Sequence, residues 1–197
     1  MKEIYIERQE EILRIAIKEN NKLKECFIEE ENSGPVPGEI YKGVVKNIVP
    51  AIKCAFIDIG HNKDCYMYLD EKFHNTKIKK GDELIVEVLK EAIDKKGAKV
   101  TSAFGIPGTY CVVVNMNKNI SFSKKINNKD FEALVERSLI KPKDIGVMIR
   151  TNAAQVDINT LNDEVEALYE IYKNVIKRSE YSRNPILLFS DAGEIGR

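Results

Sequence analysis

The feature that most constrains this chain is residues 38–70, where short apolar runs alternate with turns in GEIYKGVVKNIVPAIKCAFIDIGHNKDCYMYLD. Successive side chains of a strand point to opposite faces of a sheet, so apolar residues at alternating positions share one face. We therefore expect one apolar set to fill the inside of a small β-barrel. This set comprises Val44, Ile48, Ala55, Ile57 and Ile59.

The strand pattern continues as far as residue 104. A polar excursion follows at residues 72–80, and Leu84, Val86 and Val88 then mark a further alternating strand. Residues 98–102 form a last short strand. Five short strands with one polar excursion after the third favour a five-stranded Greek-key barrel of the OB-fold type, spanning residues 36–104.

The flanking segments predict a different architecture. Before the barrel, three alternating runs with short polar connections predict an antiparallel meander, which a linker at residues 29–35 follows. After the barrel we expect strands at residues 110–114 and 145–149, a helix capped by Asn127 or Asn128, a long helix opened by a capping box at residues 160–163, and a strand at residues 186–189.

This order of elements predicts an RNase H-like mixed sheet with helices. Three antiparallel strands precede a strand-helix-strand-helix-strand series, and residues 1–35 and 105–197 would form one discontinuous subdomain. The barrel would be inserted at a hairpin, where the two ends of an insertion lie close together. The predicted fold class is α+β or α/β, interrupted by the OB-fold barrel.

Composition limits the classes of function. Lys and Arg number 31, as do Asp and Glu, so any affinity for nucleic acid must come from local basic patches. The four cysteines include no C-x-x-C pair, which predicts free thiols and no metal or other cofactor in this chain. No apolar run has membrane-spanning length, and we expect a soluble cytoplasmic protein with no membrane partner.

The acidic residues do not form a nuclease pattern. Two-metal cleavage of RNA needs several carboxylates at one point. The first strand contains Glu3 and Glu7 but no Asp, and Asp144 and Asp157 lack an obvious acidic partner. We expect these four side chains to be solvated strand ends and assign no catalytic residue, which disfavours an autonomous RNase H-like nuclease.

Aromatic and basic residues of the barrel predict one binding surface. Phe56 and Tyr66 fall on short strands beside turns, where an aromatic ring can face outward. With Lys96 they would form a groove that stacks bases and contacts phosphates, and Lys42 and Lys95 would add charge. The alternative is that Phe56, which lies in an apolar run, belongs to the core.

A second candidate surface follows the predicted strand at residues 145–149. The strand ends at Arg150 and Thr151. Ligands of α/β sheets bind at the carboxyl ends of strands, and Arg with Thr suits a grip on phosphate. The segment SFSKKI at residues 121–126 would add backbone N–H groups and lysine charge. The alternative is that a charged residue simply terminates the strand.

Five motifs occur in order along the chain: YKG at residues 41–43, AFIDIG at 55–60, DKKGAKVTS at 94–102, GTYCVVV at 108–114 and GVMIRTNA at 146–153. Together they resemble the amino-terminal part of the RNase E/G endoribonucleases over nearly all 197 residues. The resemblance implies an S1 RNA-binding domain inserted into a catalytically inert RNase H-like subdomain, and a part in RNA processing and decay.

The resemblance also implies roles for single residues. Phe56, Tyr66 and Lys96 match positions that contact single-stranded RNA, and Tyr66 stands where a Phe is usual. Two segments match a pocket that senses the 5′-monophosphate of RNA. The pocket residues are Arg150, Thr151, Ser121 and Phe122. In the last two, Ser and Phe replace a glycine and an aliphatic residue of the family pattern.

In the family, a DNase I-like subdomain follows, with two aspartates for the catalytic magnesium and a zinc-binding cysteine motif. We expect magnesium and structural zinc only in that carboxyl-terminal part, so this chain would bind single-stranded RNA without cleaving it. The full-length protein would be a candidate homo-oligomer. The alternative function is a stand-alone S1-type RNA-binding regulatory module.

Overall fold

The structure is a computed structural model that describes residues 2–9, 12–30, 34–71, 77–93 and 96–190. It divides into two compact units, Met1–Gly34 and Pro35–Arg197. The first unit contains β1 (Lys2–Gln9), β2 (Ile12–Glu19) and β3 (Lys22–Glu30), paired antiparallel in the order β1-β2-β3. Asn20 and Asn21 connect β2 and β3 with positive φ angles of 51° and 63°, as a two-residue hairpin turn requires. The predicted meander is confirmed.

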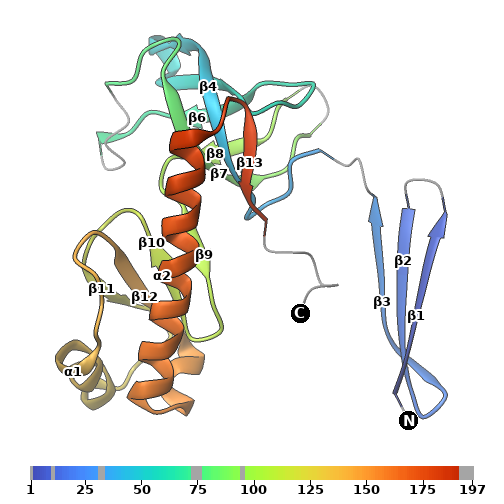
Figure 1. Cartoon of the computed structure of the whole chain (residues 1–197), viewed down its shortest axis with the longest axis vertical. Helices are drawn as coiled ribbons and strands as arrows, with labels where there is room; N and C mark the ends of the chain where they lie inside the picture. The colour runs from blue at the N-terminus through green and yellow to red at the C-terminus, as the bar shows by residue number, and fades with distance from the viewer. Residues whose placement is uncertain (1, 10–11, 31–33, 72–76, 94–95, 191–197) are drawn as a thin grey trace. The chain divides into compact units, whose positions relative to one another are not determined.

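The second unit begins with the predicted five-stranded barrel (Figure 1). Its strands are β4 (Ile40–Val49), β5 (Cys54–Asp58), β6 (Cys65–Tyr68), β7 (Glu83–Lys90) and β8 (Lys99–Thr101), and a 3₁₀ helix, Pro50–Ile52, joins the first two. The strands follow the order β4-β5-β6-β8-β7, and pairing of β4 with β7 closes the ring. β8 runs parallel to β6, and the other pairs within the ring are antiparallel.

The barrel core follows the predicted alternation with one correction. Ala55, Ile57 and Ile59 are buried as expected, but Val44 and Ile48 are only partly buried, and Val45 is fully buried instead. The cause is a register shift in β4 between Val45 and Asn47. A bulge inserts one extra residue, so counting back by twos from Ile48 selects the wrong valine.

The rest of the second unit contains a four-stranded sheet and two helices. The elements are β9 (Gly105–Pro107), β10 (Cys111–Val114), β11 (Ile120–Phe122), α1 (Lys129–Ser138), β12 (Gly146–Ile149), a 3₁₀ helix (Thr151–Gln155), α2 (Ile158–Tyr181) and β13 (Ile186–Phe189). The sheet order is β11-β12-β10-β9, with β11 parallel to β12. The sequence did not predict β9, which has only three residues.

Both helices begin at capping residues. The side chain of Asn128 accepts a hydrogen bond from the Phe131 amide at the start of α1, as predicted. The predicted capping box at residues 160–163 is wrong, because α2 begins earlier. Asp157 caps α2 by accepting from the Thr160 amide at 2.9 Å.

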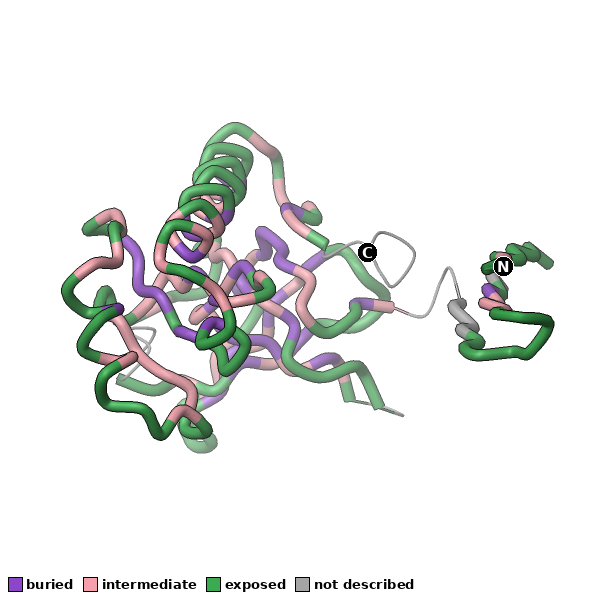
Figure 2. Tube along the Cα trace, turned by 90° about the horizontal axis from the view of Figure 1, so that it is seen from below, coloured by how far each residue is buried: buried purple, intermediate pink, exposed green. Residues whose placement is uncertain are grey.

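α2 packs its apolar stripe against the four-stranded sheet. Leu161, Val165 and Leu168 are buried in one cluster with Val113 of β10 and Ile149 of β12. Figure 2 shows that much of the long coil of α2 is exposed. This is the one-sided burial expected of an amphipathic helix on a sheet.

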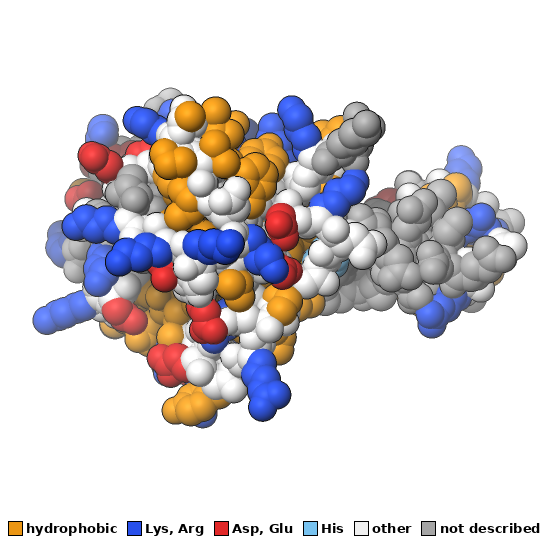
Figure 3. Space-filling view, turned by 90° about the horizontal axis from the view of Figure 1, so that it is seen from above, with side chains coloured by type: hydrophobic (Ala, Val, Ile, Leu, Met, Phe, Trp, Pro, Cys, Tyr) orange, Lys and Arg blue, Asp and Glu red, His pale blue; other side chains and the backbone are white. Residues whose placement is uncertain are grey.

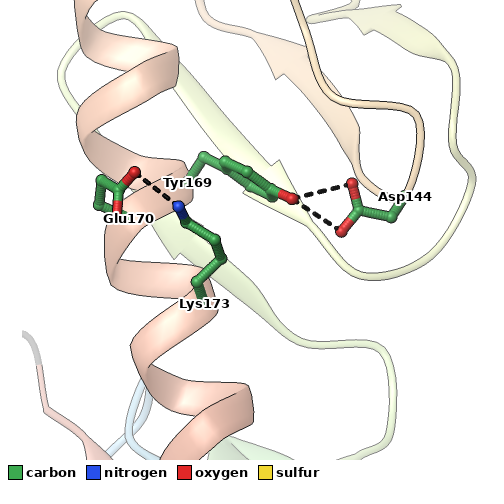
Figure 4. Close-up of polar contacts among 4 residues, drawn as sticks. All are labelled: Asp144, Tyr169, Glu170 and Lys173. Atoms are coloured by element: carbon green, nitrogen blue, oxygen red, sulfur yellow. Dashed lines mark hydrogen bonds and ion pairs between the residues drawn. The ribbon is translucent and has the colours of Figure 1, made fainter.

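Aromatic side chains extend this contact toward the loop before β12 (Figure 4). The Tyr169 hydroxyl donates to both carboxylate oxygens of Asp144, at 3.2 and 3.1 Å. The rings of Tyr169, Tyr172 and Phe104 stack in series, with centroids 6.1 and 5.8 Å apart. Asp144 and Asp157 therefore anchor and cap α2.

The last strand differs from the prediction. β13 pairs antiparallel with β4 of the barrel, with Ile186 opposite Lys42, and does not extend the four-stranded sheet. Leu188 is buried in the same cluster as Ile40 of β4. An RNase H-like sheet that joins residues 1–35 to residues 105–197 stays a prediction. Within the described residues, no helix has the length and apolarity to cross a membrane.

Candidate nucleic-acid interface

The three barrel residues singled out in the sequence lie in one hollow on the outside of the barrel. Phe56 of β5 and Tyr66 of β6 stand directly opposite each other in the strand register. Phe56 is partly exposed between the buried Ala55 and Ile57, so the interpretation of Phe56 as a core residue is wrong. A cavity of about 500 Å³ is lined by Ile52, Cys54, Phe56, Lys63, Asp64, Tyr66, Tyr68, Lys96 and Gly97.

A close backbone approach places Lys96 at the rim of this hollow. A Cβ atom on Gly97 would lie 1.9 Å from the carbonyl oxygen of Asp64, so only glycine fits at this position. The Tyr66 amide donates to the Ala98 carbonyl at 2.9 Å, which holds the same turn against β6. The lysine thus stands beside the aromatic rings because the turn after it is tied to the strand that carries Tyr66.

Sequence reasoning missed Tyr68, which lies on the same face of β6 as Tyr66. The two rings meet edge to face, with centroids 5.9 Å apart and an interplanar angle of 83°. The Lys99 ammonium lies 5.2 Å from the centroid of the Tyr68 ring, a cation–π distance. The signal was present, because residues two apart on a strand share a face.

The lysines at the hollow agree only in part with those expected. Lys42 is buried, forms an ion pair with Glu83 at 2.8 Å and donates to the Ser182 carbonyl at 3.1 Å, so it does not line the hollow. Lys95 lies outside the described residues. Lys96 lines the hollow as expected, and Lys63, which the sequence did not indicate, lines it too. Figure 3, viewed from the barrel end, shows hydrophobic side chains gathered among Lys and Arg side chains.

The second predicted surface lies at one edge of the four-stranded sheet. β11 and β12 are parallel, with Ser121 opposite Met148 and Phe122 opposite Ile149. The Ser123 amide donates to the Ile149 carbonyl at 2.9 Å. Because both strands end at this edge, the structure brings the segment after β11 beside Arg150 and Thr151, as predicted.

The side chains at this edge differ in exposure. Arg150 and Thr151 are exposed, and Arg150 donates from its guanidinium to the Gly108 carbonyl. Ser121 and Phe122 are partly buried, and Phe122 packs against the core beneath α2. The edge thus presents the cation of Arg150 and the hydroxyl of Thr151.

Comparison with known proteins finds similarity to one family. Residues 105–197 match the model of the Ribonuclease E/G family. Ribonuclease G of Haemophilus influenzae is 26% identical over 186 residues, which cover 84% of this chain and 38% of that protein. The chain is similar to the ribonuclease E/G proteins.

Further proteins show the same similarity. Ribonuclease E of Buchnera aphidicola subsp. Schizaphis graminum is 29% identical over 207 residues, which cover 96% of this chain and 21% of that protein. Ribonuclease G of Escherichia coli K12 is 24% identical and matches 90% of this chain and 40% of its own length. The chain spans less than half the length of each of these proteins. The resemblance read from its motifs is confirmed.

Proposed function

We propose that this chain binds single-stranded RNA and senses its 5′ end as the amino-terminal region of a ribonuclease E/G-type endoribonuclease. The observation that carries the proposal is the hollow in which Phe56, Tyr66 and Lys96 meet on the outer face of the barrel. Aromatic rings stack bases whatever their identity, at about 1–3 kcal/mol per base, and lysines hold the backbone phosphates. The barrel would thus serve as an S1-type domain.

The end-sensing part of the proposal rests on the edge of the four-stranded sheet. Arg150 carries five N–H donors in a fork that matches phosphate, and Thr151 adds a hydroxyl beside it. Ser121 and Phe122 reach the same edge from β11. We assign the 5′-monophosphate to this group of four residues, Arg150, Thr151, Ser121 and Phe122.

The chain's part in the reaction is binding, and cleavage requires other residues. Asp144 and Asp157, two carboxylates weighed as nuclease ligands, instead bond to Tyr169 and to the start of α2. In this proposal residues 1–35 and 105–197 form an inert RNase H-like subdomain around the S1-type barrel. The protein would act in RNA processing and decay in the cytoplasm.

The test is binding of fluorescent single-stranded RNA with either a 5′-monophosphate or a 5′-hydroxyl. The double variant Phe56→Ala, Tyr66→Ala should weaken the binding of both RNAs by about 2–6 kcal/mol, which is the loss of two stacked bases. Arg150→Ala should remove only the preference for the phosphate. Tyr181→Ala, which alters an exposed tyrosine on α2, is the matched control and should change neither affinity.

Two outcomes would contradict the proposal. Unchanged affinity in the Phe56 and Tyr66 double variant would mean that this face of the barrel does not bind RNA. Equal binding of the two RNAs by the unaltered chain would remove end sensing and favour the stand-alone S1-type binding module.

A further inference from the structure

The loop at residues 108–111 is closed around a carboxylate from α2. Three successive backbone amides, those of Thr109, Tyr110 and Cys111, donate to the carboxylate of Glu164 at 2.7, 2.8 and 2.9 Å. Successive N–H groups that converge in this way form a nest that binds anions. Here the anion is a side chain of the protein, 53 residues further along the chain at the nearest of these contacts.

Gly108 allows the carboxylate to come this close. A Cβ atom at this position would lie 2.8 Å from both Cδ of Glu164 and Cδ1 of Leu168. A side chain at this position would therefore displace the ends of the Glu164 and Leu168 side chains from the loop. The Gly108 amide also donates to the Cys111 carbonyl at 2.8 Å, which closes the turn.

The same loop provides the acceptors that hold Arg150. The Gly108 carbonyl accepts from the Arg150 guanidinium, and the Tyr110 carbonyl accepts from the Arg150 amide at 2.8 Å. Glu164 thus accepts hydrogen bonds from the amides of this loop, and two carbonyls of the same loop accept hydrogen bonds from Arg150. The contact with Gly108 engages one of five guanidinium donors, and a two-pronged grip on phosphate needs two.

The pKa of the buried Cys111 thiol responds to the charges of both Glu164 and Arg150. Burial raises the pKa of this thiol, Glu164 raises it further, and Arg150 lowers it. The carboxylate and the guanidinium therefore shift the pKa of the same thiol in opposite directions. A shift of the loop would change the surroundings of both.

We propose that Glu164 is the positioning residue for Arg150: its carboxylate fixes the loop at residues 108–111 so that the guanidinium is held ready for a terminal phosphate. The inference rests on the proposed role of Arg150 in sensing the 5′-monophosphate. It adds a residue that touches no RNA and acts only through the backbone of this loop.

The test uses the whole chain with Glu164→Gln, which keeps the shape of the side chain. The amide nitrogen of Gln is a donor, so at least one of the three loop amides loses its acceptor. The ratio of the Kd for 5′-hydroxyl RNA to that for 5′-monophosphate RNA should fall at least ~5-fold toward 1, because a charge-assisted contact loses its alignment. The Kd for 5′-hydroxyl RNA should stay the same.

Three further measurements complete the design. Amide hydrogen exchange at Thr109, Tyr110 and Cys111 should accelerate in Glu164→Gln. Glu166→Gln, which alters an exposed carboxylate two residues further along α2, is the matched control and should change nothing. Glu164→Asp keeps the charge on a shorter side chain, should retain part of the ratio, and replaces the Gln variant if that variant does not fold.

Each outcome decides a separate point. If the unaltered chain does not discriminate between the RNAs, the proposed function fails, whatever exchange shows at the loop. If the loop amides exchange faster in Glu164→Gln while the ratio is unchanged, Glu164 is structural only and the inference is overturned. Tighter binding of 5′-monophosphate RNA by this variant would also overturn it, because the nest itself would then be the phosphate site.

Discussion

Tyr68 extends the aromatic surface of the hollow beyond the residues that the sequence indicated. Its side chain is 53% exposed and stands edge to face with Tyr66, under the ammonium of Lys99. In the proposed complex, a ring at right angles to Tyr66 would contact a neighbouring base where the RNA strand bends. In a binding titration, Tyr68→Ala should therefore weaken the binding of single-stranded RNA by about 1–3 kcal/mol, equally for either 5′ end. Affinity equal to that of the Tyr181→Ala control would exclude Tyr68 from the RNA surface.

Glu87 on β7 is a partly buried carboxylate that ties the barrel to the adjoining sheet. It accepts from the Gly105 amide of β9 at 2.8 Å, and burial raises its pKa above the ordinary value. Glu87 of the folded protein therefore stays protonated over a pH range in which Glu87 of the unfolded chain has lost its proton. The contribution of Glu87 to the free energy of unfolding is therefore complete at low pH and falls as pH rises through that range.

Glu87→Gln should remove this dependence, because Gln stays neutral and keeps an acceptor for Gly105. The stability of the variant relative to the unaltered chain should rise as pH rises above the ordinary pKa of Glu. Chemical denaturation at a series of pH values measures it, with the exposed Glu91→Gln as control. Parallel pH profiles of Glu87→Gln and the unaltered chain would contradict the assignment.

Single residues differ in how far the sequence reveals them. Alternation was enough to place Phe56 and Tyr66 outside the barrel, because their apolar neighbours must point inward. It failed at Val44, since a bulge leaves no mark in an apolar run. Glu164 had no signal at all, because its partners are backbone amides, which every residue but proline carries.

The start of α2 gives a test at the level of a whole element. Asp157 accepts from the Thr160 amide, and that hydrogen bond lowers the pKa of its carboxyl. The stabilisation is therefore complete above the ordinary Asp pKa and is lost as pH falls through the lowered one. Asp157→Ala should destabilise the chain at neutral pH and approach the unaltered stability in acid, as measured by urea unfolding.

Asp163→Ala is the matched control, because this residue lies in the capping box that the sequence predicted. Asp163 is exposed inside α2, beyond the true start of the helix. Its loss should have a smaller effect than the loss of Asp157, and no acid dependence of the same kind. The opposite ranking would move the start of α2 to the predicted position.

Pairing partners of elements were harder to predict than the elements themselves. The spacing of apolar residues along the sequence identified the barrel strands and both helices, because these are local features. The pairing partner of β13 depends on where α2 ends. The 24 residues of α2 extend about 36 Å. That length returns the chain from the four-stranded sheet to β4, a distance that no local pattern contains.

At the scale of the molecule, the barrel and the four-stranded sheet belong to one compact unit. Ile40 of β4 is buried in the cluster formed by α2 and the sheet, and β13 adds to the barrel. The hollow on the barrel and the edge that carries Arg150 thus belong to the same compact unit. Binding at the two surfaces should therefore combine on a single RNA long enough to reach both.

This combination can be tested with Phe56→Ala and Arg150→Ala, alone and together, on a long 5′-monophosphate RNA. The two side chains belong to separate surfaces with no shared contact among the interactions described here. Losses from independent sites add within about 0.3–0.5 kcal/mol, so the double variant should lose the sum of the single effects. On 5′-hydroxyl RNA, Arg150→Ala should be silent in both backgrounds. A double variant no weaker than Phe56→Ala on the phosphorylated RNA would mean that the strand occupies only one surface at a time.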